Sequence, residues 1–261
     1  MKLNKKINQL TLTSIVVLSL ASSSAFALEA KNEPLVKKVL QAFKGKNINA
    51  IAKLVSYPLE REAPLPAIKN EKEFIQRFND VFDQHLLGSI VNSNVQKDWD
   101  EVGWRGIMLG DGDIWINYDG QISAINYQSP TELMVSNRLR AKGRRAMHRS
   151  VSQYAISVLD WQTKRFHIRV DELKDGQLRY TSWSKGKKTS QKPDLVLLNG
   201  KLQMDGNGRN QSYVFHNGEF KYQLKVNSIG ASSATYGMLK VFKSGQEVGS
   251  EAVVSVGRNN N

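Results

Sequence analysis

The sequence predicts an α+β fold in two parts: helices on a bent antiparallel sheet, followed by a small all-β antiparallel barrel or sandwich. Apolar residues recur at helical spacing as far as residue 85. From residue 102 the apolar spacing becomes that of strands, and from residue 151 short β-rich runs alternate with Gly-containing turns. Helices that are separate in sequence from antiparallel strands are typical of the α+β class.

The first 27 residues predict a secretory signal peptide. A start with three lysines precedes an apolar run over residues 10–21, and the A-x-A cleavage signal Ala25-Phe26-Ala27 follows. The apolar run is too short to span a bilayer as a helix, and no later run is longer. We therefore expect cleavage after Ala27, no transmembrane segment, and a soluble periplasmic or secreted protein that meets no cytoplasmic nucleic acid.

The charge of the chain favours anionic partners. It has 37 Lys and Arg against 24 Asp and Glu, a net charge of +13. Without the three lysines of the signal peptide, 34 basic residues remain against 24 acidic ones, a net charge of +10. Such a charge suits lipid headgroups, lipopolysaccharide or an acidic protein, although many exported proteins are simply basic. The chain has no Cys, so packing without disulfides must stabilise it.

Three helices are predicted at the start of the mature chain, over residues 32–45, 47–55 and 70–85. Asn32 can cap the first helix, and Gly45 fits its end. Asn70 and Glu73 form a capping box at the start of the third helix, whose apolar stripe extends to His85. Because the apolar residues fall on one face of each helix, we assign them to the core.

An antiparallel meander is predicted from Val102. The runs GWRGIML, DIWINY and QISAINY are separated by turns at Gly110-Asp111-Gly112 and Asp119-Gly120, and Asp-Gly between β-rich runs favours a hairpin. The segments SYPLEREAPLPAIKNEKEFIQRFNDVFD and GWRGIMLGDGDIWINYDGQISAINYQS resemble small exported proteins with the cystatin-like, nuclear-transport-factor-like fold. The resemblance covers residues 32–128 and implies helices packed into the concave face of a bent sheet. That superfamily includes enzymes and binding modules, so the resemblance implies no particular function.

The second half predicts eight or nine short strands joined by hairpin turns. The turns are expected at Asp175-Gly176, Asn199-Gly200, Asn217-Gly218 and Ser244-Gly245. The phrases RVDELKDGQLRYTSWSKG, KPDLVLLNG and SYVFHNGEFKY resemble a pattern of uncharacterised secreted bacterial proteins, and this resemblance implies no activity. The predicted organisation is a signal peptide over residues 1–27, a cystatin-like domain over 28–130, a basic connecting helix over 131–150 and a β domain over 151–257.

The connecting helix contains the segment RLRAKGRRAMHRS, which has six cations and no acid. Thr131 is the expected cap, and the expected buried stripe is Leu133, Met134 and Leu139. Cations near the end of a helix complement its partial negative charge, so one interpretation is a solvated helix end. The alternative is an anion-binding site, for which the candidate residues are Arg138, Arg140, Arg144 and Arg145.

A second candidate site is the segment RYTSWSKGKK, in which aromatic residues alternate with cations. Its candidate residues are Arg179, Tyr180, Trp183, Lys185, Lys187 and Lys188. Strand alternation places Tyr180 and Ser182 on one face, and Arg179, Thr181 and Trp183 on the other. Such a segment suits an acidic partner or a glycan. The alternative is that Trp183 belongs to the core and the lysines to a solvated loop.

Catalytic and metal motifs are scarce in the sequence. The four His residues lack HExxH spacing, and without Cys a structural zinc site is not expected. Ser182-Trp183-Ser184-Lys185 matches S-x-x-K, but it follows a strand-like run, whereas that nucleophile begins a helix. Asp111, Asp113 and Asp119 resemble a calcium loop, but its twelfth position is Ile122 rather than Glu. We expect neither cofactor nor metal.

These observations favour an exported binding protein without catalysis, whose partner is a protein or an envelope polyanion. An inhibitor or immunity protein against an envelope-acting enzyme is one concrete form of this hypothesis. Two alternatives remain open: a periplasmic hydrolase that uses the concave pocket of the first domain, and an envelope-associated structural protein. The oligomeric state does not follow from the sequence.

Overall fold

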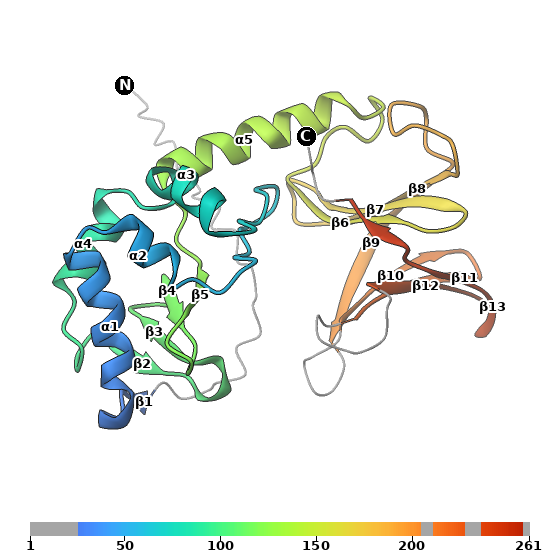
Figure 1. The fold of residues 1–261 in the computed structure, drawn as a ribbon. Coiled ribbons are helices and arrows are strands. Elements are labelled where there is room, and N and C mark those ends of the chain that lie inside the picture. The colour runs from blue at the N-terminus through green and yellow to red at the C-terminus, as the bar shows by residue number, and fades with distance from the viewer. Residues whose placement is uncertain (1–25, 205–210, 228–235, 258–261) are drawn as a thin grey trace, which may run out of the picture.

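The computed structural model describes residues 26–204, 211–227 and 236–257, which form two parts joined by one long helix (Figure 1). The first part combines helices with a five-stranded antiparallel sheet, and the second is a nine-stranded antiparallel sheet. This confirms the predicted α+β class. The predicted signal peptide, as far as residue 25, lies outside the described residues.

The helices begin near the predicted positions, but not every predicted cap is formed. Their bounds are α1 (Glu33–Lys44), α2 (Ile48–Ala52), α3 (Glu71–Val81), α4 (Gln84–Asn92) and α5 (Pro130–Arg145), with 3-10 turns η1 (Ala30–Asn32) and η2 (Gly103–Arg105). Asn70 caps α3 as predicted, because its side chain accepts a hydrogen bond from the Glu73 amide at 3.0 Å. Asn32 does not cap α1 in this way; its side-chain amide donates to the Glu101 carboxylate at 2.8 Å.

The predicted third helix is two helices. Phe82 is extended, with φ −103° and ψ 97°, and so ends α3. The side chain of Asp83 then accepts a hydrogen bond from the Leu86 amide at 2.9 Å and opens α4. The assignment of His85 to the apolar face was therefore wrong, because the new cap turns that side chain outward.

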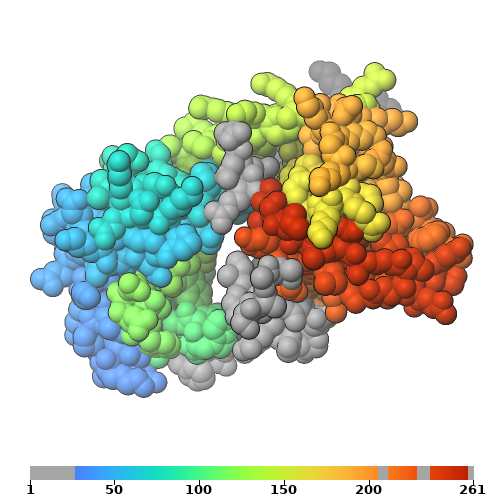
Figure 2. All heavy atoms as spheres, turned by 45° about the vertical axis from the view of Figure 1, so that its right-hand side comes forward, coloured from blue at the N-terminus to red at the C-terminus, as the bar shows by residue number. Residues whose placement is uncertain are grey.

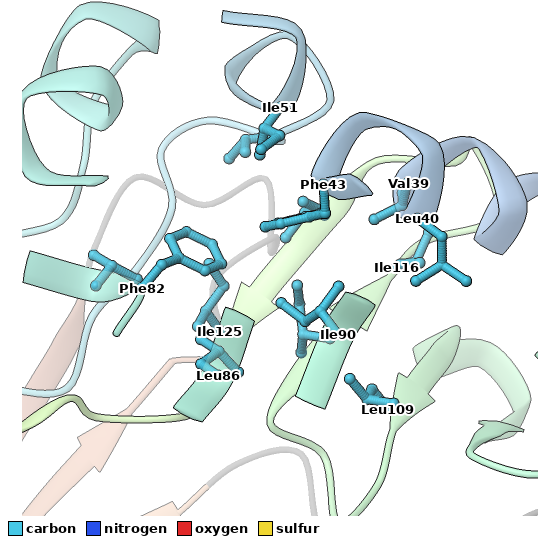
Figure 3. Packing of buried hydrophobic residues seen from close by; sticks show 14 of the residues in the cluster. Val39, Leu40, Phe43, Ile51, Phe82, Leu86, Ile90, Leu109, Ile116 and Ile125 are labelled. Carbon is cyan, nitrogen blue, oxygen red and sulfur yellow. The ribbon is translucent and has the colours of Figure 1, made fainter. Parts of the chain in front are cut away.

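The sheet of the first part runs in the order β1-β2-β3-β4-β5. Its strands are β1 (Phe26–Ala27), β2 (Trp99–Glu101), β3 (Ile107–Leu109), β4 (Ile114–Ile116) and β5 (Ile122–Ile125). The predicted meander is confirmed as β3, β4 and β5, and β2 adds a strand before it. Helix and sheet residues share one core, in which Phe43 and Leu86 lie among strand residues such as Ile116 and Ile125 (Figure 3). Apolar side chains thus fill the space between helices and sheet.

The second part is a single sheet with the strand order β13-β12-β11-β10-β9-β8-β7-β6-β14. Its strands are β6 (Ile156–Gln162), β7 (Phe166–Glu172), β8 (Leu178–Ser184), β9 (Leu195–Met204), β10 (Gln211–Asn217), β11 (Phe220–Val226), β12 (Gly237–Lys243), β13 (Gln246–Ala252) and β14 (Ser255–Val256). Three of the four predicted turns join consecutive strands. The turn at Asn199-Gly200 was wrong, because β9 continues through it. Gly200 lies against the Phe215 ring, which leaves no room for a Cβ atom.

This sheet curls into a half-barrel, rather than forming a sandwich of two sheets. Its two edge strands, β13 and β14, are separated in the chain by only Val253 and Val254. Val253 donates to the Gly237 carbonyl at 3.0 Å, and Val254 donates to the Gln162 carbonyl at 2.8 Å. The curl brings β12 over β6, so that a Cβ atom at Gly237 would lie 2.7 Å from the Trp161 ring. An apolar core follows from this closure: Trp161, Ile168, Val170, Tyr180, Leu197, Tyr213, Phe215, Leu224, Leu239 and Val253.

The start of α5 is fixed by a serine that precedes the predicted cap. Ser129 rather than Thr131 caps the helix, and its hydroxyl accepts a hydrogen bond from the Glu132 amide at 3.1 Å. The same hydroxyl donates to the Asp80 carbonyl and so connects α5 to α3. The Ser-Pro sequence suits this position because proline is favoured in the first helical turn.

The buried face of α5 is polar, which corrects the predicted apolar stripe. Glu132 and Ser136 are buried, whereas Leu133 and Met134 are 42% and 64% exposed. The cause is Arg61, a buried residue of the loop before α3, whose guanidinium binds both carboxylate oxygens of Glu132. A buried carboxylate needs such a partner. Once Glu132 faces inward, Met134 lies on the opposite side of the helix and Leu133 lies on its flank.

The residues just after the predicted cleavage site are part of the fold. Leu28 is 4% exposed and belongs to the first core. The buried Glu101 carboxylate accepts a hydrogen bond from the Glu29 amide at 2.8 Å. Ala27 is paired with Asp100 in β1, so cleavage after Ala27 would remove β1 and leave β2 at the edge of the sheet.

We predict that the chain needs Leu28 and Glu29 but not the residues before them. The free energy of unfolding of a chain that begins at Ala30 should be about 2–4 kcal/mol lower than that of a chain that begins at Leu28. The loss combines a buried leucine side chain with one hydrogen bond to a buried carboxylate. Urea denaturation of the two chains measures the difference, and equal midpoints would contradict the role given to Leu28.

We also predict that the two parts fold separately, because their main apolar cores have no residue in common. Chains of residues 28–145 and 146–261 should each melt cooperatively. Ending the first chain at Pro130 should cost about 3–5 kcal/mol, because the buried Arg61 would lose Glu132. Calorimetry measures the melting of these chains. In the full chain, Glu132→Gln at a buried position is compared with Glu71→Gln at an exposed one. Failure of both halves to fold alone would refute the division.

Candidate anion-binding surface

Two basic segments that lie far apart in the sequence are neighbours in the structure. The His148 amide donates a hydrogen bond to the Thr189 carbonyl at 2.8 Å, which ties the chain after α5 to the loop after β8 (Figures 1 and 2). Beneath them lies a small apolar core of Met147, Val151, Tyr154 and Trp183. The end of α5 and the loop over residues 185–193 therefore form one continuous surface.

This surface is positively charged, and the two segments that form it contain no acid. Residues 138–159 and 185–193 contain no Asp or Glu. The exposed cations, none of them in an ion pair with another described residue, are Arg138, Arg145, Arg149, Lys185, Lys188 and Lys192. We call these six residues the basic surface. Lys187 differs, because it is paired with Asp194. This hydrogen bond, together with two from Ser184, lowers the pKa of the Asp194 carboxyl to about 2.

Two of the four arginines predicted in α5 have structural partners. Arg140 donates to the Ala63 carbonyl at 3.2 Å and lies 3.8 Å from the Glu62 carboxylate. Arg144 donates to the Tyr154 carbonyl at 3.3 Å, and its guanidinium lies 5.9 Å from the centre of the Tyr154 ring. These two side chains thus hold α5 against its neighbours, whereas Arg138 and Arg145 point into solvent.

Three residues of the second predicted site are buried and cannot contact a partner directly. Arg179, Tyr180 and Trp183 are 5%, 2% and 0% exposed. The predicted alternation is observed: Tyr180 faces the half-barrel core, and Trp183 faces the small core under α5. Trp183 also donates from its indole nitrogen to the Gln191 carbonyl at 2.8 Å, so it anchors the basic loop.

A buried cluster of charges supports the basic surface from below. Asp171 is 0% exposed and accepts hydrogen bonds from Arg169 at 2.6 Å and from Arg179 at 3.0 Å. Arg179 continues to the carbonyls of Val151 at 2.6 Å and Gln153 at 3.1 Å. Asp171 therefore holds the arginine that fixes the backbone after α5.

The cluster extends to the edge of the half-barrel through Asp160. One carboxylate oxygen of Asp160 binds Arg169 at 2.7 Å, and the other binds the His167 ring nitrogen at 2.7 Å. Burial alone would lower the pKa of Arg169, but the carboxylates of Asp171 and Asp160 raise it above its ordinary value. Both carboxylate oxygens of Asp160 are thus occupied by protein partners.

Sequence reasoning missed this cluster, although a signal for it was present. His167, Arg169 and Asp171 alternate along β7, so they lie on one face of the strand. Arg179 is paired with Asp171 in the adjacent strand β8. A face of alternating, opposite charges across two strands indicates an ion-pair cluster, but its burial depends on the cover supplied by residues 147–154.

A cleft of about 200 Å³ lies between the two parts. The loop over residues 60–67 forms one side, and Ser157, Val158, Asp160 and Gly257 form the other. Among the described residues, no three acidic or imidazole side chains are placed to hold a metal ion. No helix in the described ranges has the length and apolar character needed to cross a bilayer.

Comparisons with protein-family models, with curated proteins and with solved structures each found no match for the chain.

We predict that Asp171 is essential to the stability of the second part. Asp171→Asn should lower the free energy of unfolding by about 3–5 kcal/mol, because two buried guanidinium groups would lose their shared carboxylate. Asp119→Asn, at an exposed turn, should change it by less than about 0.5 kcal/mol. Urea denaturation compares the two variants, and equal effects would show that the cluster contributes no net stability.

Proposed function

We propose that the protein binds an anionic surface of the cell envelope through the basic surface, without catalysis. The main support for this proposal is the His148–Thr189 hydrogen bond, which joins the acid-free segments over residues 138–159 and 185–193. Six exposed cations then lie over one region with no acid in either segment to neutralise them. An acidic protein is the alternative partner, and it would be bound by the same charges.

Several features favour attraction over long distances rather than a deep, specific site. Exposed cations retain their hydration and pair weakly one at a time, but together they create a field that draws in anions. The supporting side chains Trp183 and Arg179 fix the backbone beneath them. The cations therefore extend from a rigid base, which lowers the ordering cost of binding.

We further propose export to the periplasm or beyond, with removal of residues 1–27, and membership of the cystatin-like class for the first part. The A-x-A signal supports export, and helices packed on an antiparallel meander support the class. A hydrolase in the first part would need polar side chains between helices and sheet. That space holds the apolar core, which is why we favour binding.

We predict that binding to heparin, used as a polyanion probe, depends on the basic surface and on salt. Replacing Arg145, Arg149, Lys185 and Lys188 with Gln should weaken heparin binding at least tenfold and leave the melting temperature nearly unchanged. A control with the same charge change replaces Lys44, Lys53, Lys69 and Lys72, which are exposed on the first part. Binding should disappear at 1 M salt, where the Debye length falls to about 3 Å from about 10 Å at 0.1 M.

Equal losses in the two quadruple variants would show that only net charge matters and would refute the basic surface as the site. Surface plasmon resonance on immobilised heparin measures both variants under one condition. Replacing Arg140 and Arg144 with Gln should instead lower the melting temperature, because these arginines hold α5 in place.

A further inference from the structure

The outward face of α5 combines apolar and cationic side chains. Met134, Arg138 and Arg145 are exposed, and their spacing of four and eleven residues places them on one stripe of the helix. Leu133 lies about 100° around the helix from Met134, on the flank between the stripe and the inward side. It is 42% exposed, and Met134 is 64% exposed. One end of the stripe is therefore apolar, and the other continues into the basic surface.

The exposure of these apolar side chains is enforced by the fold. Glu132 is held inward by Arg61, and Ser136 is buried one turn later. Gly143 lies on the same inward side, where a Cβ atom would come within 2.9 Å of the Tyr154 hydroxyl. Because the Arg61–Glu132 pair and the hydrogen bond from Arg144 to the Tyr154 carbonyl fix the two ends of α5, the helix cannot rotate to bury Met134.

The position of α5 suits a flat partner. The helix has 16 residues, and at about 1.5 Å per residue it is about 24 Å long. It lies along the outside of the molecule and connects the two parts (Figures 1 and 2). A planar surface can thus contact Met134, Arg138 and Arg145 along the stripe together.

We propose that α5 docks on the surface of a bilayer that contains anionic phospholipid, with Leu133 and Met134 entering the interface between headgroups and acyl chains. This inference rests on the proposed function of the basic surface and adds a partner class to it. A bilayer supplies phosphates for Arg138 and Arg145 and hydrocarbon for the two apolar side chains. A soluble polyanion supplies only the charges, so it leaves the exposure of Leu133 and Met134 without a counterpart.

The test compares two probes on the same variants of the full chain. The probes are vesicles of equimolar phosphatidylcholine and phosphatidylglycerol, and heparin. Replacing Leu133 and Met134 with Ser should weaken vesicle binding about tenfold and leave heparin binding unchanged. The matched control replaces Val196 and Leu198 with Ser, since these residues of β9 are similarly exposed at 40% and 50%. Vesicles of phosphatidylcholine alone should bind poorly.

A second measurement reports insertion directly. The chain has no Cys, so Met134→Cys carries a single environment-sensitive fluorophore. Its emission should shift to shorter wavelength on anionic vesicles and remain unchanged on heparin, whereas a label at Lys53→Cys should respond to neither. The labelled chains must retain the melting temperature of the original protein.

The outcomes separate the two proposals. Vesicle binding that is unaffected by the Leu133 and Met134 changes, with no spectral shift, would overturn bilayer docking while leaving the basic surface intact. Heparin binding without vesicle binding would overturn it as well. If the quadruple cation variant still bound both vesicles and heparin as tightly as the original protein, the basic surface itself would be refuted.

Discussion

The buried ion pair between Arg61 and Glu132 fixes α5, and the relation between the two parts depends on that helix. Arg61 provides two donors to the carboxylate, and two further donors reach the carbonyls of Ile125 and Tyr127. A buried charge is tolerated when it is paired with an opposite charge of good geometry. This condition selects one orientation of α5 and makes its inward face polar.

The same condition sorts the many cations of the chain into two classes. Arg169 and Arg179 are desolvated, and both are paired with Asp171. The cations of the basic surface remain in water and need no partner. Some of the cations that make up the net positive charge are therefore buried in ion pairs, and others are exposed without a partner. Only the exposed ones can attract an anion. Among residues close in sequence, such as Arg144 and Arg145, the two kinds alternate with the helical turn.

Each buried polar cluster also has a mechanical consequence. Arg179 holds the carbonyls of Val151 and Gln153, and Trp183 holds that of Gln191. These backbone segments carry exposed cations that would otherwise move independently. Strand β8 therefore supports the basic surface but contributes no residue to it. One face of β8 packs in the half-barrel core, and the other anchors the two basic segments. The proposed contact with a bilayer follows from the same rigidity, because α5 cannot withdraw its apolar side chains.

The sequence by itself determined part of the local structure: the Asn70 cap of α3, most of the hairpin turns and the change from helical to strand spacing. Turns such as Asp119-Gly120 are specified locally, because a positive φ is required whatever surrounds them. Tertiary structure decided everything that depends on a distant partner. The apolar spacing of Leu133 and Met134 predicted burial, but Arg61, about seventy residues earlier, reversed it. For Trp183 the sequence left a surface site and a core position both open, and the cover by residues 147–154 placed it, like Arg179, in the interior. Whether a charge or an aromatic ring is buried depends on the segment that packs over it and, for a charge, on the oppositely charged side chain. Neither can be read from the neighbouring sequence.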